Sequence, residues 1–120
     1  YSKILEIHES HNQPLQRILI KENTKVHVIP VNVVSHFEAQ DDYVLIHTKD
    51  KSYIKSERIS NLENALDPQI FLRLHRSFLV NLNFINRIES YSKDSKLVKL
   101  HNGVEVPVSR SGYEKLKQIL

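Results

Sequence analysis

The chain has 120 residues, of which 40% are hydrophobic and 26% charged, a composition typical of one globular domain and not of a disordered chain. It contains no cysteine and only two glycines, Gly103 and Gly112. This excludes disulfides, thiolate metal sites, glycine-rich dinucleotide fingerprints and P-loops. No apolar run approaches the roughly 18 residues of a membrane span, and we expect a cytoplasmic protein without a membrane segment.

Charge is distributed unevenly along the chain. The net charge is +3 at pH 7, but residues 1–70 hold 8 Lys and Arg against 10 Asp and Glu, whereas residues 71–120 hold 9 against 4. The basic side chains of the second half either coat a solvated face or form a site for a polyanion. Charge alone leaves both interpretations open.

The first residues differ in character from the rest. Residues 1–14 mix charged residues, histidines and scattered aliphatics, and they end at Pro14. We expect them to be a tail or linker from an upstream domain, followed by one compact domain over residues 15–120. Because the chain starts at Tyr1 without an initiator methionine, we expect it to be part of a longer protein.

From residue 17 onward, apolar residues that alternate with polar ones predict a series of β-strands. Ile and Val dominate these runs, and both prefer the pleated, half-buried setting of a sheet. The pattern predicts a mainly β domain with short polar turns. The predicted strands are Arg17–Lys21, Lys25–Ile29, Val33–Glu38, Tyr43–Thr48, Ser52–Lys55, Phe71–His75 and Ser77–Asn81, with a further one around Ile85 and Ile88.

Two short helices are predicted between and after these strands. Ser60 and Glu63 have the spacing of a capping box, in which the serine caps the helix and the glutamate reaches back to it. Ser111 and Glu114 repeat this spacing near the end of the chain. We expect Ser60 and Ser111 to be the N-caps of helices that need tertiary packing for stability.

The last predicted hairpin can close with a loop of two or of three residues around Gly103. A two-residue loop pairs Val98 with Pro107, whereas a three-residue loop over residues 101–103 pairs Val98 with Val106. The second register gathers apolar side chains on one face, and a slip by one residue would scatter them. We therefore expect the three-residue loop, with Gly103 at the left-handed position that such loops require.

The sequence offers little for catalysis. None of the seven histidines forms a metal-binding motif such as HExxH, and most are expected to be polar residues on strand faces. Asp41 and Asp42 could ligate Mg²⁺ or act as a carboxylate pair, but adjacent acids between two strands usually form a turn. Ser77 lies near His75 in the chain, yet no oxyanion-hole motif accompanies it. We expect no enzymatic activity, no cofactor and no metal.

The segment from Phe71 to Asn81 places His, Arg and Ser at a break between two apolar runs. Its string RLHRSFLVN, followed by a strand pair and by VPVSR before a terminal helix, resembles the LytTR-type DNA-binding domain. Three further stretches match the family's pattern, namely VVSHFEA followed by DYV, SNLENAL and HNG. The resemblance covers about residues 17–120, with Asp42 in place of a frequent Asn and Phe37 in place of a frequent Ile.

The resemblance implies a fold of three small, mostly antiparallel sheets with short helices. It also implies sequence-specific binding of double-stranded DNA and regulation of transcription, as the output domain of a bacterial two-component response regulator whose receiver domain joins through residues 1–14. Family members insert loops into successive major grooves and read paired direct repeats, so we expect a dimer on DNA and a monomer when the domain is isolated. Carried over to this sequence, the base readers are Arg76, Arg110 and the loop Asp41-Asp42-Tyr43.

The chemistry of these residues agrees with such a role. An arginine presents a planar fork of donors that matches guanine O6 and N7, whereas Asp41 and Asp42 can only accept, for example from cytosine N4. Phosphate contacts, which position the protein without reading sequence, are expected from Ser77, Lys93 and Lys96. Support beneath the readers is expected from His75, Asn81 and Ser109.

An alternative is a non-catalytic interaction module whose basic C-terminal half binds RNA or an acidic protein. RNA readers commonly stack bases on aromatic side chains. Here the Tyr and Phe residues mostly fall within apolar strand patterns, where core packing is the simpler use. Duplex DNA is therefore the first hypothesis.

Overall fold

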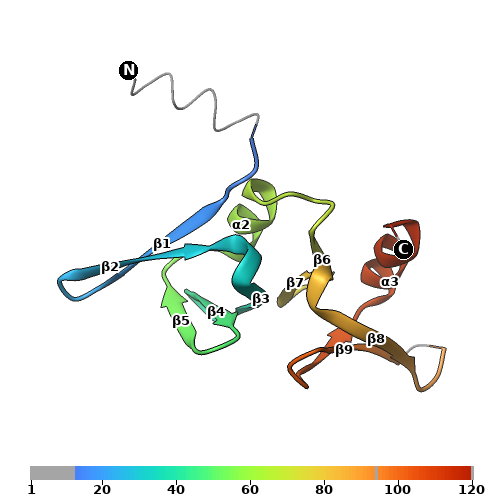
Figure 1. Cartoon of the computed structure of the whole chain (residues 1–120). Helices are drawn as coiled ribbons and strands as arrows, with labels where there is room; N and C mark the ends of the chain where they lie inside the picture. The colour runs from blue at the N-terminus through green and yellow to red at the C-terminus, as the bar shows by residue number, and fades with distance from the viewer. Residues whose placement is uncertain (1–12, 94, 120) are drawn as a thin grey trace.

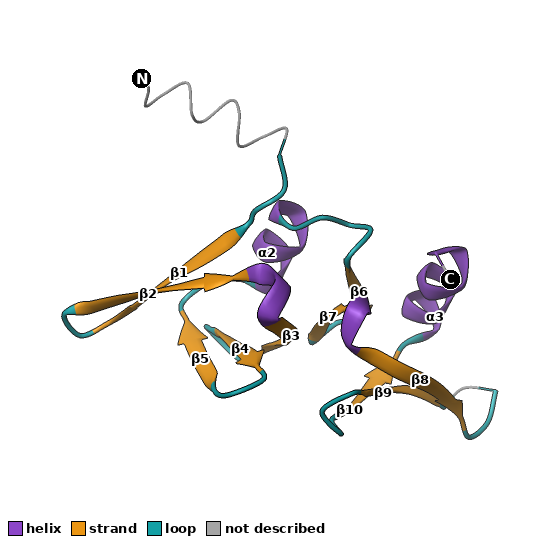
Figure 2. Cartoon of the chain, viewed as in Figure 1, coloured by secondary structure: helices purple, strands orange, loops and turns teal. Residues whose placement is uncertain are grey.

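A five-stranded antiparallel sheet forms the centre of the fold, with a smaller antiparallel sheet on either side of it (Figure 1, Figure 2). The computed structural model describes residues 13–93 and 95–119. The central sheet has the order β5-β4-β3-β7-β6. Its strands are β3 (Val34–Ala39), β4 (Val44–Thr48), β5 (Ser52–Lys55), β6 (Phe71–His75) and β7 (Phe78–Asn81).

The flanking elements complete the predicted architecture. One small sheet is the hairpin of β1 and β2, and the other has the order β10-β9-β8. The strands are β1 (Arg17–Glu22), β2 (Lys25–Pro30), β8 (Ile85–Ser90), β9 (Lys96–Leu100) and β10 (Glu105–Val108), and the helices are α2 (Ile59–Ala65) and α3 (Arg110–Ile119). The expected class, three small antiparallel sheets with short helices, is confirmed.

Strand boundaries differ from the predicted ones where turns intervene. Residues Val31–Val33 form a 3-10 turn, so β3 begins at Val34 and not at Val33. Arg76 and Ser77 form the turn between β6 and β7. The predicted linker over residues 1–14 falls mostly outside the described residues. Within them, the N–H of Leu15 donates to the carbonyl oxygen of Ala65 at 2.8 Å, which ties this point of the chain to α2.

The two faces of the central sheet serve two hydrophobic cores, because successive side chains of a strand point to opposite faces. On β7, Leu79 packs into a core shared with β1, β2 and α2, whereas Val80 packs into a core shared with β8, β9, β10 and α3. Both side chains are fully buried. Helix α3 packs on β6 through Leu116 and Leu74, which are also fully buried. The β6–β7 turn is therefore the end of a hairpin that is buried on both sides.

Both predicted N-caps are wrong. Helix α2 begins at Ile59, with Arg58 at the N-cap and no capping side chain; the burial of Ile59 against the core draws the helix start ahead of Ser60. Helix α3 begins at Arg110, and the hydroxyl of Ser109, not Ser111, accepts a hydrogen bond from the N–H of Gly112 at 3.0 Å. Within the described part of the chain, neither helix has the length and apolar character of a membrane span.

The expected three-residue loop of the last hairpin is confirmed. Val98 pairs with Val106, and the N–H of Leu100 donates to the carbonyl oxygen of Val104 at 2.9 Å. Gly103 has φ of 90°, a conformation that side chains strongly disfavour. The register places Val98 and Val106 in the core, where both are fully buried.

Candidate nucleic-acid interface

Three loops from distant parts of the sequence are tied together at one end of the central sheet. The N–H of Ala39, the last residue of β3, donates to the carbonyl oxygen of Ser77 at 2.8 Å. The N–H of Ser109 donates to the carbonyl oxygen of Leu74 at 2.8 Å. The loop after β3, the β6–β7 turn and the start of α3 are therefore neighbours, and they carry the residues that the sequence predicts as base readers.

The β6–β7 turn presents Arg76 to solvent. The side chain of Arg76 is exposed, whereas His75 and Ser77 are half-buried. The ring Nδ1 of His75 accepts a hydrogen bond from the N–H of Ser77 at 3.1 Å, and the ring lies edge-on against Phe78 with centroids 5.7 Å apart. His75 thus holds the turn through its ring, and its supporting role in DNA binding stays a prediction.

The β3–β4 loop is short and exposed. The N–H of Gln40 donates to the carbonyl oxygen of Tyr43 at 2.9 Å, which closes the turn around two acids. Asp41, Asp42 and Tyr43 are all exposed. Carboxylates in this position carry acceptors only, so on a DNA surface they must face base donors or lie away from phosphates.

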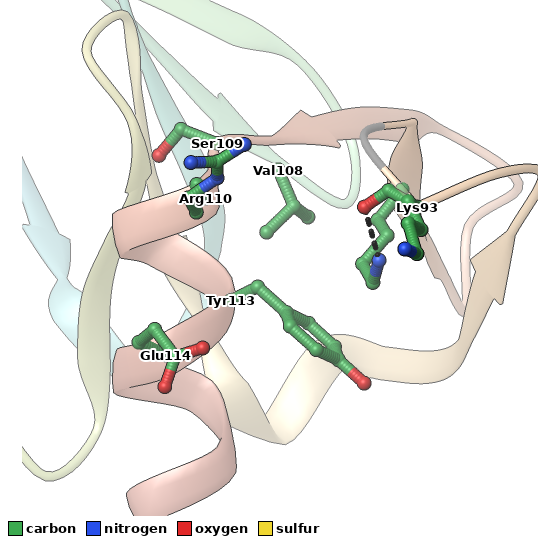
Figure 3. A pocket seen from close by; sticks show the side chains of 7 residues that line it. Lys93, Val108, Ser109, Arg110, Tyr113 and Glu114 are labelled. Atoms are coloured by element: carbon green, nitrogen blue, oxygen red, sulfur yellow. Dashed lines mark hydrogen bonds between the residues drawn. The ribbon is translucent and has the colours of Figure 1, made fainter.

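The third loop opens a basic pocket at the start of α3. The pocket has a volume of about 490 Å³ and is lined by Lys93, Lys96, Val108, Ser109, Arg110, Tyr113 and Glu114. Figure 3 shows the Tyr113 side chain extending from α3 along one side of the pocket, with Lys93 on the side away from the helix. The Nζ of Lys96 donates to the carbonyl oxygen of Lys93 at 2.8 Å and lies 4.8 Å from the centre of the Tyr113 ring.

The charges of this pocket favour an anion. Its three cations, Lys93, Lys96 and Arg110, face one carboxylate, that of Glu114. Helix α3 begins at Arg110, one of the lining residues, so the pocket borders the end of the helix where its partial positive charge is concentrated. The predicted phosphate contacts Lys93 and Lys96 are therefore brought next to Arg110.

Asn81 lies apart from these loops. It is fully buried at the far end of β7 from the turn. Its amide donates to the carbonyl oxygen of Val34 at 3.0 Å, and its Oδ1 accepts from the N–H of Asn83 at 2.9 Å. These bonds join β3 to β7 and cap the 3-10 turn over Leu82–Phe84, so any support from Asn81 is exerted through the sheet.

The sequence interpretation did not single out Arg73. This residue stands between two apolar residues of β6 and looked like an ordinary polar position on a strand. Its guanidinium donates to the carbonyl oxygens of His75 and Arg76 and to the carboxylate of Glu63. The only hint in the sequence is the placement of an arginine three residues before a predicted reader.

A cluster of His36, Glu38 and His47 contains potential metal ligands. Their ligand atoms lie within 4.8 Å of one another, and Nε2 of His47 is 3.0 Å from Oε1 of Glu38. The two imidazoles are stacked, with centroids 4.3 Å apart and planes 15° apart. Because an imidazole nitrogen binds a metal in the plane of its ring, the two rings cannot converge on one ion without rotating.

The same cluster has a distinct electrostatic character. Burial, with a smaller contribution from the neighbouring His47, lowers the pKa of His36 to about 4. His36 is therefore neutral at neutral pH, and its Nδ1 lies 3.0 Å from the hydroxyl of Ser35. The cluster is best described as a hydrogen-bonded network between β3 and β4.

Comparison with known proteins assigns the class of domain. The family model described as LytTr DNA-binding domain matches residues 24–120. A solved LytTr DNA-binding domain of a putative methyl-accepting/DNA response regulator from Bacillus cereus superimposes with a TM-score of 0.79 at 26% identity, covering 88% of this chain and 96% of that chain. The chain belongs to the LytTr DNA-binding domain family.

Two relatives indicate the kind of protein in which such domains occur. The transcriptional regulatory protein YpdB of Escherichia coli K12 is 34% identical over 103 residues, which is 85% of this chain and 42% of YpdB. The sensory transduction protein LytT of Bacillus subtilis 168 is 25% identical over 117 residues, which is 98% of this chain and 48% of LytT. The chain thus spans less than half the length of these relatives.

Proposed function

We propose that this domain binds double-stranded DNA with sequence specificity and regulates transcription as the output domain of a longer response regulator. One observation carries the proposal: Ala39 binds Ser77 and Ser109 binds Leu74, each at 2.8 Å, so loops separated by more than 30 residues lie together on a rigid sheet. The relatives' names, transcriptional regulatory protein and sensory transduction protein, support the regulatory role.

In this proposal the loops enter successive major grooves. Arg76 is exposed in the β6–β7 turn, and Arg110 is exposed as the first residue of α3. Each guanidinium has the donor geometry for guanine O6 and N7. The loop of Asp41, Asp42 and Tyr43 lies beside the Arg76 turn and reads an adjacent position. The β3–β4 loop and the β6–β7 turn both project from one end of the central sheet. Projecting loops fit a groove of DNA better than a flat protein surface does, because each loop can enter the groove by itself.

Phosphates are bound beside the base contacts. Lys93 and Lys96 line the pocket at the start of α3, and helix N-termini favour phosphate groups. Ser77, half-buried at the β6–β7 turn, supplies a hydroxyl for a further phosphate. Such contacts fix the register of the protein on the duplex and make affinity depend on salt.

The remaining parts of the proposal concern the longer protein. A receiver domain precedes this one, residues 1–14 connect the two, and residues 15–120 form the DNA-binding unit in the cytoplasm. One such unit offers a small contact area, so a pair of them on direct repeats supplies the affinity. The isolated domain is then a monomer that binds a single half-site weakly.

Selection from a random duplex library tests the proposal. The purified domain is expected to enrich two copies of a short motif at fixed spacing, and the enriched duplex is called the selected duplex below. The same domain should bind a scrambled duplex and a single-stranded RNA of equal length more weakly. Failure to enrich any motif, or equal binding of the RNA, would contradict sequence-specific duplex recognition and favour the RNA-binding alternative.

A further inference from the structure

We infer that Arg73 is a positioning residue for DNA recognition: its guanidinium holds the β6–β7 turn in the shape that presents Arg76. The inference rests on the proposed function, since it assigns to Arg73 the orientation of a proposed base reader. Arg73 itself lies on β6, and its side chain is only 21% exposed.

The hydrogen bonds of Arg73 converge on the backbone of the turn. Its Nε lies 3.2 Å from the carbonyl oxygens of both His75 and Arg76, and its Nη2 lies 2.6 Å from that of Arg76. The residue that is proposed to read a base thus has its own carbonyl oxygen bound by two nitrogens of one planar group. A guanidinium is the side chain with enough donors in a fixed plane to do this.

Arg73 adds to the bonds that Ala39 and His75 make with Ser77, at a point where the ladder of the sheet is irregular. The pairing of β6 with β7 shifts register between Arg73 and His75, and bulges of this kind re-aim side chains and interrupt the regular ladder. Residues 76 and 77 lie in the turn itself. Loss of Arg73 removes three hydrogen bonds to the carbonyl oxygens of residues 75 and 76, and we expect the Arg76 side chain then to sample more directions.

The guanidinium of Arg73 is also linked to the helices. The Nη1 of Arg73 donates to Oε1 of Glu63 on α2 at 2.8 Å. The other carboxylate oxygen of Glu63 lies 3.9 Å from Nζ of Lys115 on α3. The turn is therefore linked to α2 directly and to α3 through Glu63. Because Glu63 balances the charge of Arg73, we do not expect Arg73 to neutralise a phosphate of the DNA.

A double-mutant cycle on the selected duplex tests this role. The variants are Arg73→Gln, Arg73→Lys, Arg76→Ala and the double variant Arg73→Gln/Arg76→Ala, with Arg87→Gln as the matched control. Arg87 is an exposed arginine on β8 that also pairs with a glutamate, Glu89, at 2.6 Å. Dissociation constants for the selected and scrambled duplexes are measured by fluorescence anisotropy at several salt concentrations, together with the melting temperature.

The expected result is a loss of specificity that depends on Arg76. Arg73→Gln should weaken binding to the selected duplex about tenfold, the discrimination that one oriented bidentate contact provides, and leave the scrambled duplex and the salt slope unchanged. Arg73→Lys keeps the charge but loses the planar fork, so it should show most of the same loss. The double variant should bind no more weakly than Arg76→Ala alone, and Arg87→Gln should bind as the parent does.

Several outcomes would overturn the inference. They are parental binding by both Arg73 variants, a loss in the double variant equal to the two single losses combined, and a loss shared by both duplexes with a reduced salt slope, which would make Arg73 a phosphate contact. If Arg73→Gln fails to fold, Arg73→Lys decides by the same criteria. Failure of the proposed function looks different, because the selection would then enrich no motif. Failure of Arg76 as a base reader would appear as parental binding of the selected duplex by Arg76→Ala.

Discussion

The backbone N–H and the hydroxyl of Ser109 both donate to the carbonyl oxygen of Leu74, at 2.8 and 3.2 Å. Leu74 precedes Arg76 by two residues, and Ser109 directly precedes Arg110. The two proposed base readers are therefore held at a fixed separation through one carbonyl group. Because Leu74 is fully buried on β6, this link starts from the hydrophobic core.

Substitution of Ser109 should loosen this link. Ser109→Ala removes the hydroxyl's bond to Leu74 and the cap of α3 on Gly112 but keeps the backbone bond to Leu74. Loss of a serine cap costs about 1 kcal/mol. We expect the free energy of unfolding, measured by urea titration, to fall by that amount. Ser111→Ala, at the position that the sequence pattern favoured, should change it by less than about 0.5 kcal/mol; equal effects of the two substitutions would contradict the assigned cap.

Gly112 is required by the close approach of α3 to β6. A Cβ atom at this position would collide with the carbonyl oxygen of Leu74, the same atom that binds Ser109. Although alanine favours helices over glycine, Gly112→Ala should therefore destabilise the domain by about 1–3 kcal/mol, as overpacking does. The exposed Gln118 of α3 provides the control: Gln118→Ala should be nearly neutral. A more stable Gly112→Ala variant would contradict the packing.

Lys93 should act on affinity without affecting specificity. If it neutralises one phosphate, Lys93→Ala should weaken all duplexes alike and reduce the slope of log affinity against log salt by about one unit. Lys25, an exposed lysine on β2, is the matched control, and Lys25→Ala should keep the parental slope. Equal slopes for parent and Lys93→Ala between 50 and 200 mM salt would remove Lys93 from the interface.

His36 should make stability depend on pH. Its pKa of about 4 in the folded domain lies below the ordinary value of about 6.5, so the unfolded chain binds the proton first as the pH falls. The His36 contribution therefore leaves stability unchanged above pH 6.5 and lowers it as the pH drops toward 4, by about 3 kcal/mol in all. In His36→Gln the urea midpoint should depend less on pH over this range than in the parent. The same pH dependence in the variant and the parent would contradict a lowered pKa of His36.

Period-two alternation was enough to predict most strands. The register of Val98 with Val106 followed from the requirement that apolar side chains gather on one face of the hairpin. Both strand formation and hairpin register depend on residues close together in the chain, so the sequence contains the information needed to predict them. The starts of α2 and α3 were misplaced because the sequence does not show that Ile59 is buried or that Ser109 is bound to β6. In both cases the capping-box spacing is present in the sequence, but tertiary contacts start the helix at another residue.

The residues of the candidate site can be named from the sequence one by one, and their roles stay predictions, but their arrangement cannot be read from the sequence. Arg76 and Arg110 are arginines at the ends of predicted strands, and the family resemblance indicates both as base readers. That the Arg76 turn lies beside the β3–β4 loop depends on the bond from Ala39 to Ser77, which joins residues 38 positions apart. The role of Arg73 depends likewise on a turn and a helix that meet only in the folded domain.

Methylation interference on the selected duplex tests the central claim most directly, because a methyl group on guanine N7 blocks the major-groove contact of an arginine. The parent domain should lose binding when guanines in successive major grooves are methylated. Binding by Arg76→Ala should become insensitive to methylation at one of these guanines, and binding by Arg110→Ala at another. Each variant should remain sensitive to methylation at the other guanines. Binding that tolerates methylation at every guanine, or identical interference patterns for the parent and both variants, would contradict base reading by these two loops.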